Sequence, residues 1–208
     1  MECKSSSVIR YRRSLVIGIL VFVFSLGWSL VWSPSSFATL TTLPSFEEMV
    51  KVAEKIFLGT VKSIEEKPSD ANHPFPSIVT TFEVHEVFKG NVEKRISIRQ
   101  VGRKVGKASR LKLLIGLPDF RVGEKSIVLL PKPGRYVSPV AFEHGVFRVL
   151  AKTKSLDQAV VSNGNSNRSL FRKIQSSTFK ASVSRLKIMD GQPLTISSFR
   201  ELVKGVAQ

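Results

Sequence analysis

Residues 78–88 of this 208-residue chain, Ile-Val-Thr-Thr-Phe-Glu-Val-His-Glu-Val-Phe, decide the fold class. Side chains of a β-strand point alternately to its two faces, and the apolar residues of this stretch gather on one of them. The residues that we expect to face the core are Phe82, Val84 and Phe88. His85 falls on the opposite face, which we expect to meet solvent. Lys89-Gly90-Asn91 then predicts a turn.

Other short apolar segments predict a series of strands around this one. They are separated by stretches rich in Gly, Pro, Ser and Asn, with little helical pattern between them, which favours an antiparallel barrel or sandwich. The expected strands cover 56–64, 95–101, 126–130, 136–142 and 145–150.

Two capping boxes predict one helix before the strands and one after them. In such a box a Ser caps the free amide groups of the first turn and a Glu three residues later reaches back. Ser45–Glu48 predicts a helix to about Lys55, and Ser198–Glu201 predicts a final helix. The apolar stripe expected on that final helix consists of Phe199, Leu202, Val203 and Val206.

The chain begins with a basic segment and an apolar segment. No charged residue occurs from Ser14 to Phe46, and Leu15 to Trp32 is almost wholly apolar, about long enough to cross a bilayer core of ~30 Å as a helix. Basic residues before this run place the N-terminus in the cytoplasm, and Ser36-Phe37-Ala38 suits signal peptidase. Residues 1–38 are therefore expected to be a signal peptide or a membrane anchor, and the rest to be exported.

The composition limits the possible chemistry. The only cysteine, Cys3, precedes the apolar run, so the exported part has neither a disulfide nor a cysteine nucleophile. The chain holds 32 Lys and Arg against 16 Asp and Glu, and a field of this sign attracts anionic polymers and surfaces. An exported protein rarely meets nucleic acid, so we expect no nucleic-acid partner.

A basic segment over 102–118 is the best candidate binding surface. Its bases, expected on a flexible loop, are Arg103, Lys104, Lys107, Arg110 and Lys112. Such a loop predicts salt-sensitive binding of an anionic partner; the alternative is a solvated loop without a ligand.

Domain boundaries follow composition. We expect a signal or anchor over 1–38, a helix and barrel over 39–150, a flexible polar segment over 151–184, and a C-terminal segment over 185–208 that packs on the barrel.

Several short sequence segments, in this order along the chain, resemble those of a protein family. They include Ile56–Val61, Phe82–Gly90, Ile98–Gly102, Phe120–Glu124 and Gly145–Val149. Together they resemble a widespread group of exported bacterial proteins of unknown function. The first half of that group is similar to the OB-like barrel of netrin-type modules and of tissue inhibitors of metalloproteinases. The resemblance implies a small antiparallel OB-like barrel with flanking helices.

The resemblance also implies a partner, because proteins of this group accompany matrixin-like metalloproteases. Tissue inhibitors present an N-terminal cysteine to the protease zinc, and the exported part of this chain has no cysteine. A protease partner would therefore have to be bound in another way.

The residues needed for catalysis or metal binding are not arranged in any familiar motif. The three histidines, His73, His85 and His144, have no second histidine at metal-ligand spacing. No Ser lies in a Gly-x-Ser-x-Gly elbow, and no carboxylate pair is set for acid–base catalysis. Glu143 and His144 could form a polar pair near a turn. We expect no catalytic site, no metal and no cofactor.

The sequence thus predicts an exported, noncatalytic binding module of the cell envelope whose ligand is a protein or an anionic surface. One alternative is a protease-interacting module that does not use an N-terminal cysteine. A second is a hydrolase with an unrecognised site. Membrane contact is expected only through residues 15–32, if the leader is retained.

Overall fold

The computed structural model describes residues 43–105, 110–113, 116–150 and 155–207. All the elements that follow belong to the unit Thr42–Gln208. The expected leader over residues 1–38, with its apolar span 15–32, lies outside the described residues. Within the described ranges, no helix combines the length and apolar character that crossing a membrane requires.

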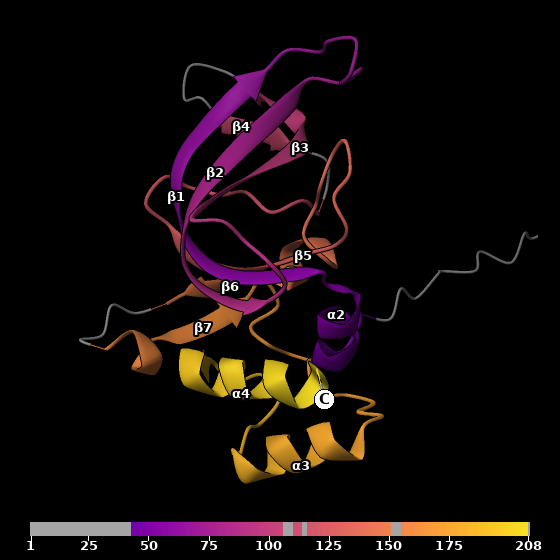
Figure 1. Cartoon of the computed structure of the whole chain (residues 1–208), viewed down its shortest axis with the longest axis vertical. Coiled ribbons are helices and arrows are strands. Elements are labelled where there is room, and N and C mark those ends of the chain that lie inside the picture. Colours follow the sequence, from indigo (N-terminus) through magenta and orange to yellow (C-terminus); the bar gives the residue numbers. More distant parts are fainter. Residues whose placement is uncertain (1–42, 106–109, 114–115, 151–154, 208) are drawn as a thin grey trace, which may run out of the picture. The chain divides into compact units, whose positions relative to one another are not determined.

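One twisted antiparallel sheet forms the framework (Figure 1). Over the described residues its eight strands lie in the order β4-β3-β2-β1-β5-β6-β7-β8. The strands are β1 (Lys55–Lys67), β2 (Ser77–Lys89), β3 (Arg95–Val105), β4 (Arg110–Leu113), β5 (Lys125–Leu130), β6 (Val146–Val149), β7 (Val160–Asn163) and β8 (Leu194–Thr195). The expected mainly β, antiparallel class is confirmed. The expected closed barrel is not, because β4 and β8 end the sheet and no strand pair of the described residues joins them.

The segment expected to be a strand over 136–142 runs beside the sheet without joining it as a strand. Its Val137 N–H donates to the carbonyl of Arg99 in β3 at 2.8 Å. The backbone then turns into the left-handed region at Ala141 (φ 53°) and Phe142 (φ 55°) and enters the short 3-10 helix η1 (Phe142–Gly145). Left-handed residues interrupt the extended backbone that a strand needs.

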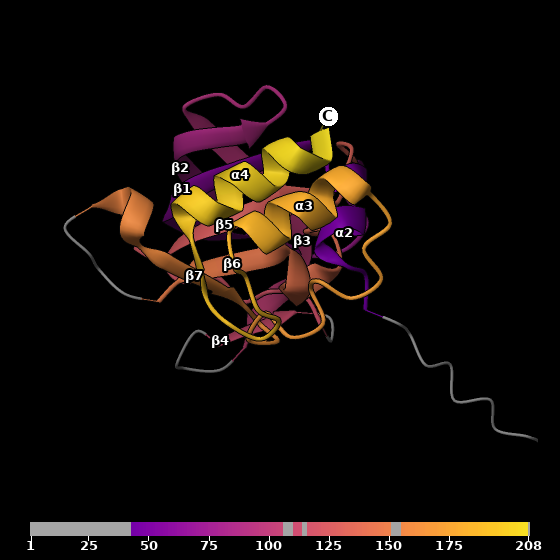
Figure 2. The same ribbon diagram turned by 90° about the horizontal axis from the view of Figure 1, so that it is seen from below.

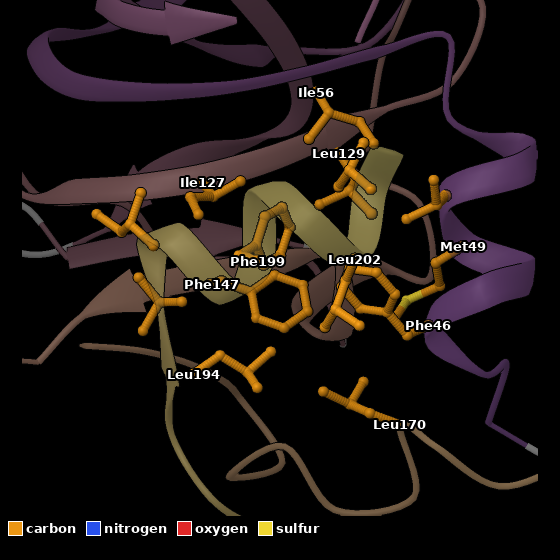
Figure 3. Close-up of a cluster of buried hydrophobic side chains, with 14 of the residues drawn as sticks. Phe46, Met49, Ile56, Ile127, Leu129, Phe147, Leu170, Leu194, Phe199 and Leu202 are labelled. Atoms are coloured by element: carbon orange, nitrogen blue, oxygen red, sulfur yellow. The ribbon is translucent and has the colours of Figure 1, made fainter. Parts of the chain in front are cut away.

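The two faces of β1 and β5 support two separate cores. Ile56 lies opposite Leu129 and Leu58 opposite Ile127. These residues face one core, here called the helical core, which Figure 3 shows beside helix α4 (Ile196–Ala207). Its other buried residues include Phe46, Met49, Phe147, Phe179, Phe199 and Leu202. Phe57 lies opposite Val128 and faces the other way. The second core, here called the strand core, consists of Phe57, Val61, Phe82, Ile98, Phe120, Val128, Leu130 and Val146.

The apolar residues of β2 divide between these cores. The prediction that Phe82 and Phe88 share one face is wrong: Phe82 is buried in the strand core, whereas Phe88 packs against the helical core. The β1–β2 register shifts between Leu58 and Gly59, so that Val84 lies opposite Gly59 but Glu86 lies opposite Leu58. This one shift exchanges the faces of the β2 residues between Phe82 and Phe88.

Three α-helices cover the helical core. They are α2 (Phe46–Val52), α3 (Ser177–Arg185) and α4 (Ile196–Ala207). In Figure 2, which views the molecule from below, α3 and α4 lie side by side in front of the sheet. The predicted capping box of Ser45 and Glu48 is confirmed in α2. The one expected at Ser198 is wrong, because α4 begins two residues earlier and Thr195 Oγ1 accepts the Ser198 N–H at 3.0 Å.

The stripe expected on α4 supplies the centre of the helical core. Phe199, Leu202 and Val203 are buried. The Phe199 ring lies 5.2 Å from that of Phe46 and 5.1 Å from that of Phe147, both edge to face. Truncating such an aromatic residue to Ala typically costs about 3–5 kcal/mol.

The segment expected to be flexible over 151–184 contains regular structure instead. Residues 155–184 include the 3-10 helix η2 (Leu156–Gln158), β7 and most of α3. Two buried asparagines order the turn after β7: Asn163 Oδ1 accepts the N–H of Asn167 at 2.8 Å, and Asn167 Oδ1 accepts that of Asn163 at 2.9 Å. Polar composition suggested disorder, but these side chains replace water as partners of the turn backbone.

Candidate functional site

The basic segment singled out in the sequence forms a β-hairpin, and the expected loop over 102–118 is corrected accordingly. Gly102 to Val105 extend β3, and β4 pairs with them. Arg103 and Lys104 lie in β3, whereas Arg110 and Lys112 lie in β4; Lys107 lies outside the described residues. Leu111 and Leu113 alternate with the two bases of β4, which is the period-2 pattern of a strand.

The register separates these bases into two groups. Arg103 lies opposite Lys112 and Val105 opposite Arg110, whereas Lys104 lies opposite Leu111. Residues directly opposite each other share a face of the sheet. Arg103, Arg110 and Lys112 therefore lie on one face of the hairpin, and Lys104 lies on the other.

The same face continues along β3 with two more arginines. Residues 95, 99 and 103 are all Arg and are separated by even numbers of residues, so they share a face at intervals of about 13 Å. The alternate positions point to the strand core, where Ile98 is buried. We call the face that holds Arg95, Arg99, Arg103, Arg110 and Lys112 the basic face.

The carboxylates near this face are mostly paired with lysines. Glu83, opposite Arg95 in the β2–β3 register, forms an ion pair with Lys62 at 2.6 Å. The hydrogen bond from Lys62 holds the pKa of Glu83 below its usual value. Glu65 pairs with Lys67 at 2.8 Å. Because these carboxylates are already paired with lysines, the arginines make the local electrostatic potential positive.

Two segments that contact each other lie beside Arg99. The 135–138 segment bonds to its carbonyl through Val137, and the hydroxyl of the neighbouring Tyr136 bonds to both the N–H and the carbonyl of Phe75, each at 3.0 Å. From the 68–76 loop, Asp70 Oδ2 lies 3.9 Å from an Arg99 terminal nitrogen. The His73 ring rests edge-on against Tyr136 at 5.7 Å.

The histidines are not gathered into a site. His85 is exposed, as expected, and its Nε2 lies 2.7 Å from Thr60 Oγ1. Desolvation and the charge of Lys125 lower the pKa of His85. His73 lies 3.0 Å from Asp70 through Nδ1. His85 and His73 therefore each contact a nearby polar side chain, and they do not contact each other.

The polar pair expected between Glu143 and His144 is replaced by another arrangement. The Glu143 carboxylate pairs with Arg148, whose Nε also lies 2.8 Å from Glu124. The carbonyl of His144 accepts a hydrogen bond from Asn163 Nδ2 at 3.2 Å. These contacts join η1 to β6 and to the turn after β7.

Two other features of the described residues offer no ligand chemistry. In the ranges that the structure describes, no group of three His, Cys, Asp or Glu side chains could hold a metal ion. A surface hollow of about 370 Å³ lies between α3 and α4. Its Glu201 pairs with Arg185 at 3.7 Å and with Lys204 at 3.4 Å, so its charges compensate one another.

Sequence reasoning located the basic segment but missed the arginines that precede it. Arg95 and Arg99 belong to the strand expected over 95–101, and the repeat of Arg at 95, 99 and 103 was the available signal. Tyr136 was missed because its role depends on the 68–76 loop, which is remote in sequence.

Comparison of the chain with models of protein families, with curated proteins and with solved structures finds no match.

Proposed function

We propose that this chain is an exported, noncatalytic binding module that binds an anionic partner of the cell envelope through the basic face. The register that brings Arg103, Arg110 and Lys112 onto the face of Arg95 and Arg99 carries the proposal. Export rests on the basic and apolar leader over residues 1–38. The net charge of +16 strengthens attraction to anions over the whole chain.

The proposal includes an OB-like arrangement for the first part of the fold. Three features support it: the meander β1-β2-β3, the pairing of β1 with β5, and the bond from Val137 to β3 across the open side. In OB-folds, ligands bind across the face of the second and third strands. The basic face occupies the corresponding strand β3, although this placement rests on fold analogy.

The test is affinity capture from envelope extract with the full-length protein as bait. The decisive variant combines Arg103→Gln, Arg110→Gln and Lys112→Gln. A matched control combines Arg172→Gln, Lys180→Gln and Lys187→Gln, which removes the same charge from exposed positions in the helical half. Both variants lower the net charge equally, so only the location of the charge differs.

We expect anionic partners to be captured by the wild type and by the control, and to be lost by the β3–β4 variant. High salt should release them, because ions screen exposed charges beyond about 10 Å at 0.1 M. Equal capture by both variants would contradict the proposal. A discrete partner that resists high salt and ignores the basic face would favour the protease-type alternative.

A further inference from the structure

Ser77 and Arg99 are neighbours on the basic face. In the β2–β3 register Val79 lies opposite Arg99 and Ser77 lies opposite Val101. Ser77 and Arg99 are therefore diagonal neighbours on one face, a relation that leaves Cβ atoms within about 8 Å. Ser77 is completely buried, and the Arg99 side chain is only 20% exposed.

Both residues hold a buried polar atom that has no hydrogen-bond partner among the residues that the structure describes. The atoms are Ser77 Oγ and Arg99 Nε. A buried polar group without a partner destabilises the folded protein, and does so more strongly where the group is charged. A guanidinium Nε–H beside a hydroxyl is a donor set suited to the oxygen atoms of an anion.

Two segments of the chain border the pair of Ser77 and Arg99. Tyr136 and Phe75 are joined through the Tyr136 hydroxyl, and the N–H of Gly102 donates to the carbonyl of Pro76 at 3.0 Å. The 68–76 loop and the 135–138 segment are thus both fixed close to Arg99. Because these segments are already fixed without a ligand, binding beside them costs less conformational entropy.

The carboxylate of Asp70 approaches the site. Its Oδ2 lies 3.9 Å from Arg99, beyond hydrogen-bond distance. Its Oδ1 is engaged within the loop by the N–H groups of Asn72 and His73, both at 2.8 Å. Asp70 therefore weakens the attraction of Arg99 for an anion without occupying the Arg99 donors.

We propose that Arg99 and Ser77 form an oxyanion site that binds one carboxylate, sulfate or phosphate group of the anionic ligand. The inference rests on the proposed function: the outer bases attract the ligand over the basic face, and this site fixes one of its charged groups. The guanidinium fork and the Ser77 hydroxyl supply directional hydrogen bonds, which a lysine at position 99 cannot reproduce.

The experiment follows the Arg99 Nε–H resonance of the full-length protein in nonionic detergent. Inorganic phosphate, inorganic sulfate and acetate are added in separate titrations. Labelled polyglutamate is titrated in a parallel experiment to report binding of a polymer. The free anions test the oxyanion site, and the polymer tests the basic face.

Four variants discriminate the site from general charge. Arg99→Lys keeps the charge and should weaken binding of the preferred free anion about tenfold, the equivalent of one charge-assisted hydrogen bond. Ser77→Ala should weaken it less, and Asp70→Asn should strengthen it. Arg172→Lys, at an exposed position in the helical half, should leave it unchanged.

Free-anion binding that Arg99→Lys leaves unaffected would overturn the site, as would the failure of all three anions to move the Nε–H resonance. If polyglutamate still bound through the outer bases, the proposed function would stand without this site. Free-anion binding at Arg99 without any polyglutamate binding would support the site and remove the proposed function.

Discussion

The backbone N–H of Val137 donates to the carbonyl of Arg99 at 2.8 Å. This bond joins the 135–138 segment to β3 at the middle of the basic face. The Val137 side chain packs on the strand core, while the neighbouring Tyr136 reaches the 68–76 loop. Core packing and the walls of the candidate site are therefore linked through two consecutive residues.

Removing the Tyr136 hydroxyl should loosen the 68–76 loop. Tyr136→Phe keeps the ring beside His73 but removes both hydrogen bonds to the Phe75 backbone. The loss of about 1 kcal/mol of local stability corresponds to roughly fivefold faster amide exchange. Hydrogen exchange at Phe75 measures the effect, and an unchanged rate would show that the hydroxyl does not hold the loop.

The buried carboxylate of Glu47 should make stability depend on pH. It accepts the N–H of Gln175 at 2.9 Å and that of Ser176 at 3.3 Å, and it pairs with Lys51. Burial by itself raises the pKa of Glu47, but these hydrogen bonds outweigh it and hold the pKa below the ordinary value of 4.5. A carboxyl with a lowered folded-state pKa contributes stability above its unfolded-state pKa and loses it as pH falls through the folded-state value.

The measurement compares Glu47→Gln with the exposed neighbour Glu54→Gln. At pH 7, Glu47→Gln should lower the free energy of unfolding by about 1–3 kcal/mol, and Glu54→Gln should have little effect. The deficit of Glu47→Gln should shrink as pH falls below 4.5. A deficit that stayed constant down to acid pH would rule out the carboxylate charge as its cause.

Two glycines with similar backbone angles should respond differently to alanine. Gly90 has φ +76° and an added Cβ would meet the Glu54 carbonyl at 2.3 Å, whereas Gly123 has φ +84° and nothing within 4 Å. Gly123→Ala should cost about 1–2 kcal/mol from the left-handed conformation alone. Gly90→Ala adds overpacking and should cost about 3 kcal/mol. Equal losses in denaturant unfolding would contradict the close approach of Gly90 to Glu54.

The ion pairs made by α4 should differ in how much they contribute to the free energy of unfolding. Arg200 binds both oxygens of Glu86, at 2.6 and 3.0 Å, and Asp157 at 2.7 Å; these hydrogen bonds raise its pKa. Arg200→Met should lower the free energy of unfolding by about 2 kcal/mol. The exposed pair of Arg185 with Glu201, at 3.7 Å, should contribute close to nothing. A larger loss for Arg185→Met would reverse this ranking.

Local patterns in the sequence predicted β1, β2, β3, β5 and β6 and the first helix. Alternation in β2 and the capping box of Ser45 and Glu48 each depend on neighbouring residues, so a single sequence contains the signal. The division of Phe82 and Phe88 between two cores depends on bulges in the β1–β2 ladder. Those bulges arise from strand pairing and have no local signature at either phenylalanine.

Polar segments were harder to interpret. The density of bases around Arg103 concealed the alternation of Leu111 and Leu113 that marks β4. Asn163 and Asn167 suggested disorder by composition, although their side chains bond to the turn backbone. For the site, the hairpin bases were found, but Ser77 and Arg99 were not. Their proximity becomes visible only once β2 and β3 are paired.

The basic face is tested most directly by the affinity of the purified full-length protein for labelled polyglutamate, measured by fluorescence anisotropy at low and high salt. The account predicts that the variant Arg103→Gln, Arg110→Gln, Lys112→Gln binds more weakly and with a smaller salt dependence. The control Arg172→Gln, Lys180→Gln, Lys187→Gln should match the wild type. Equal loss in both variants would mean that net charge, and not the β3–β4 face, attracts the anion.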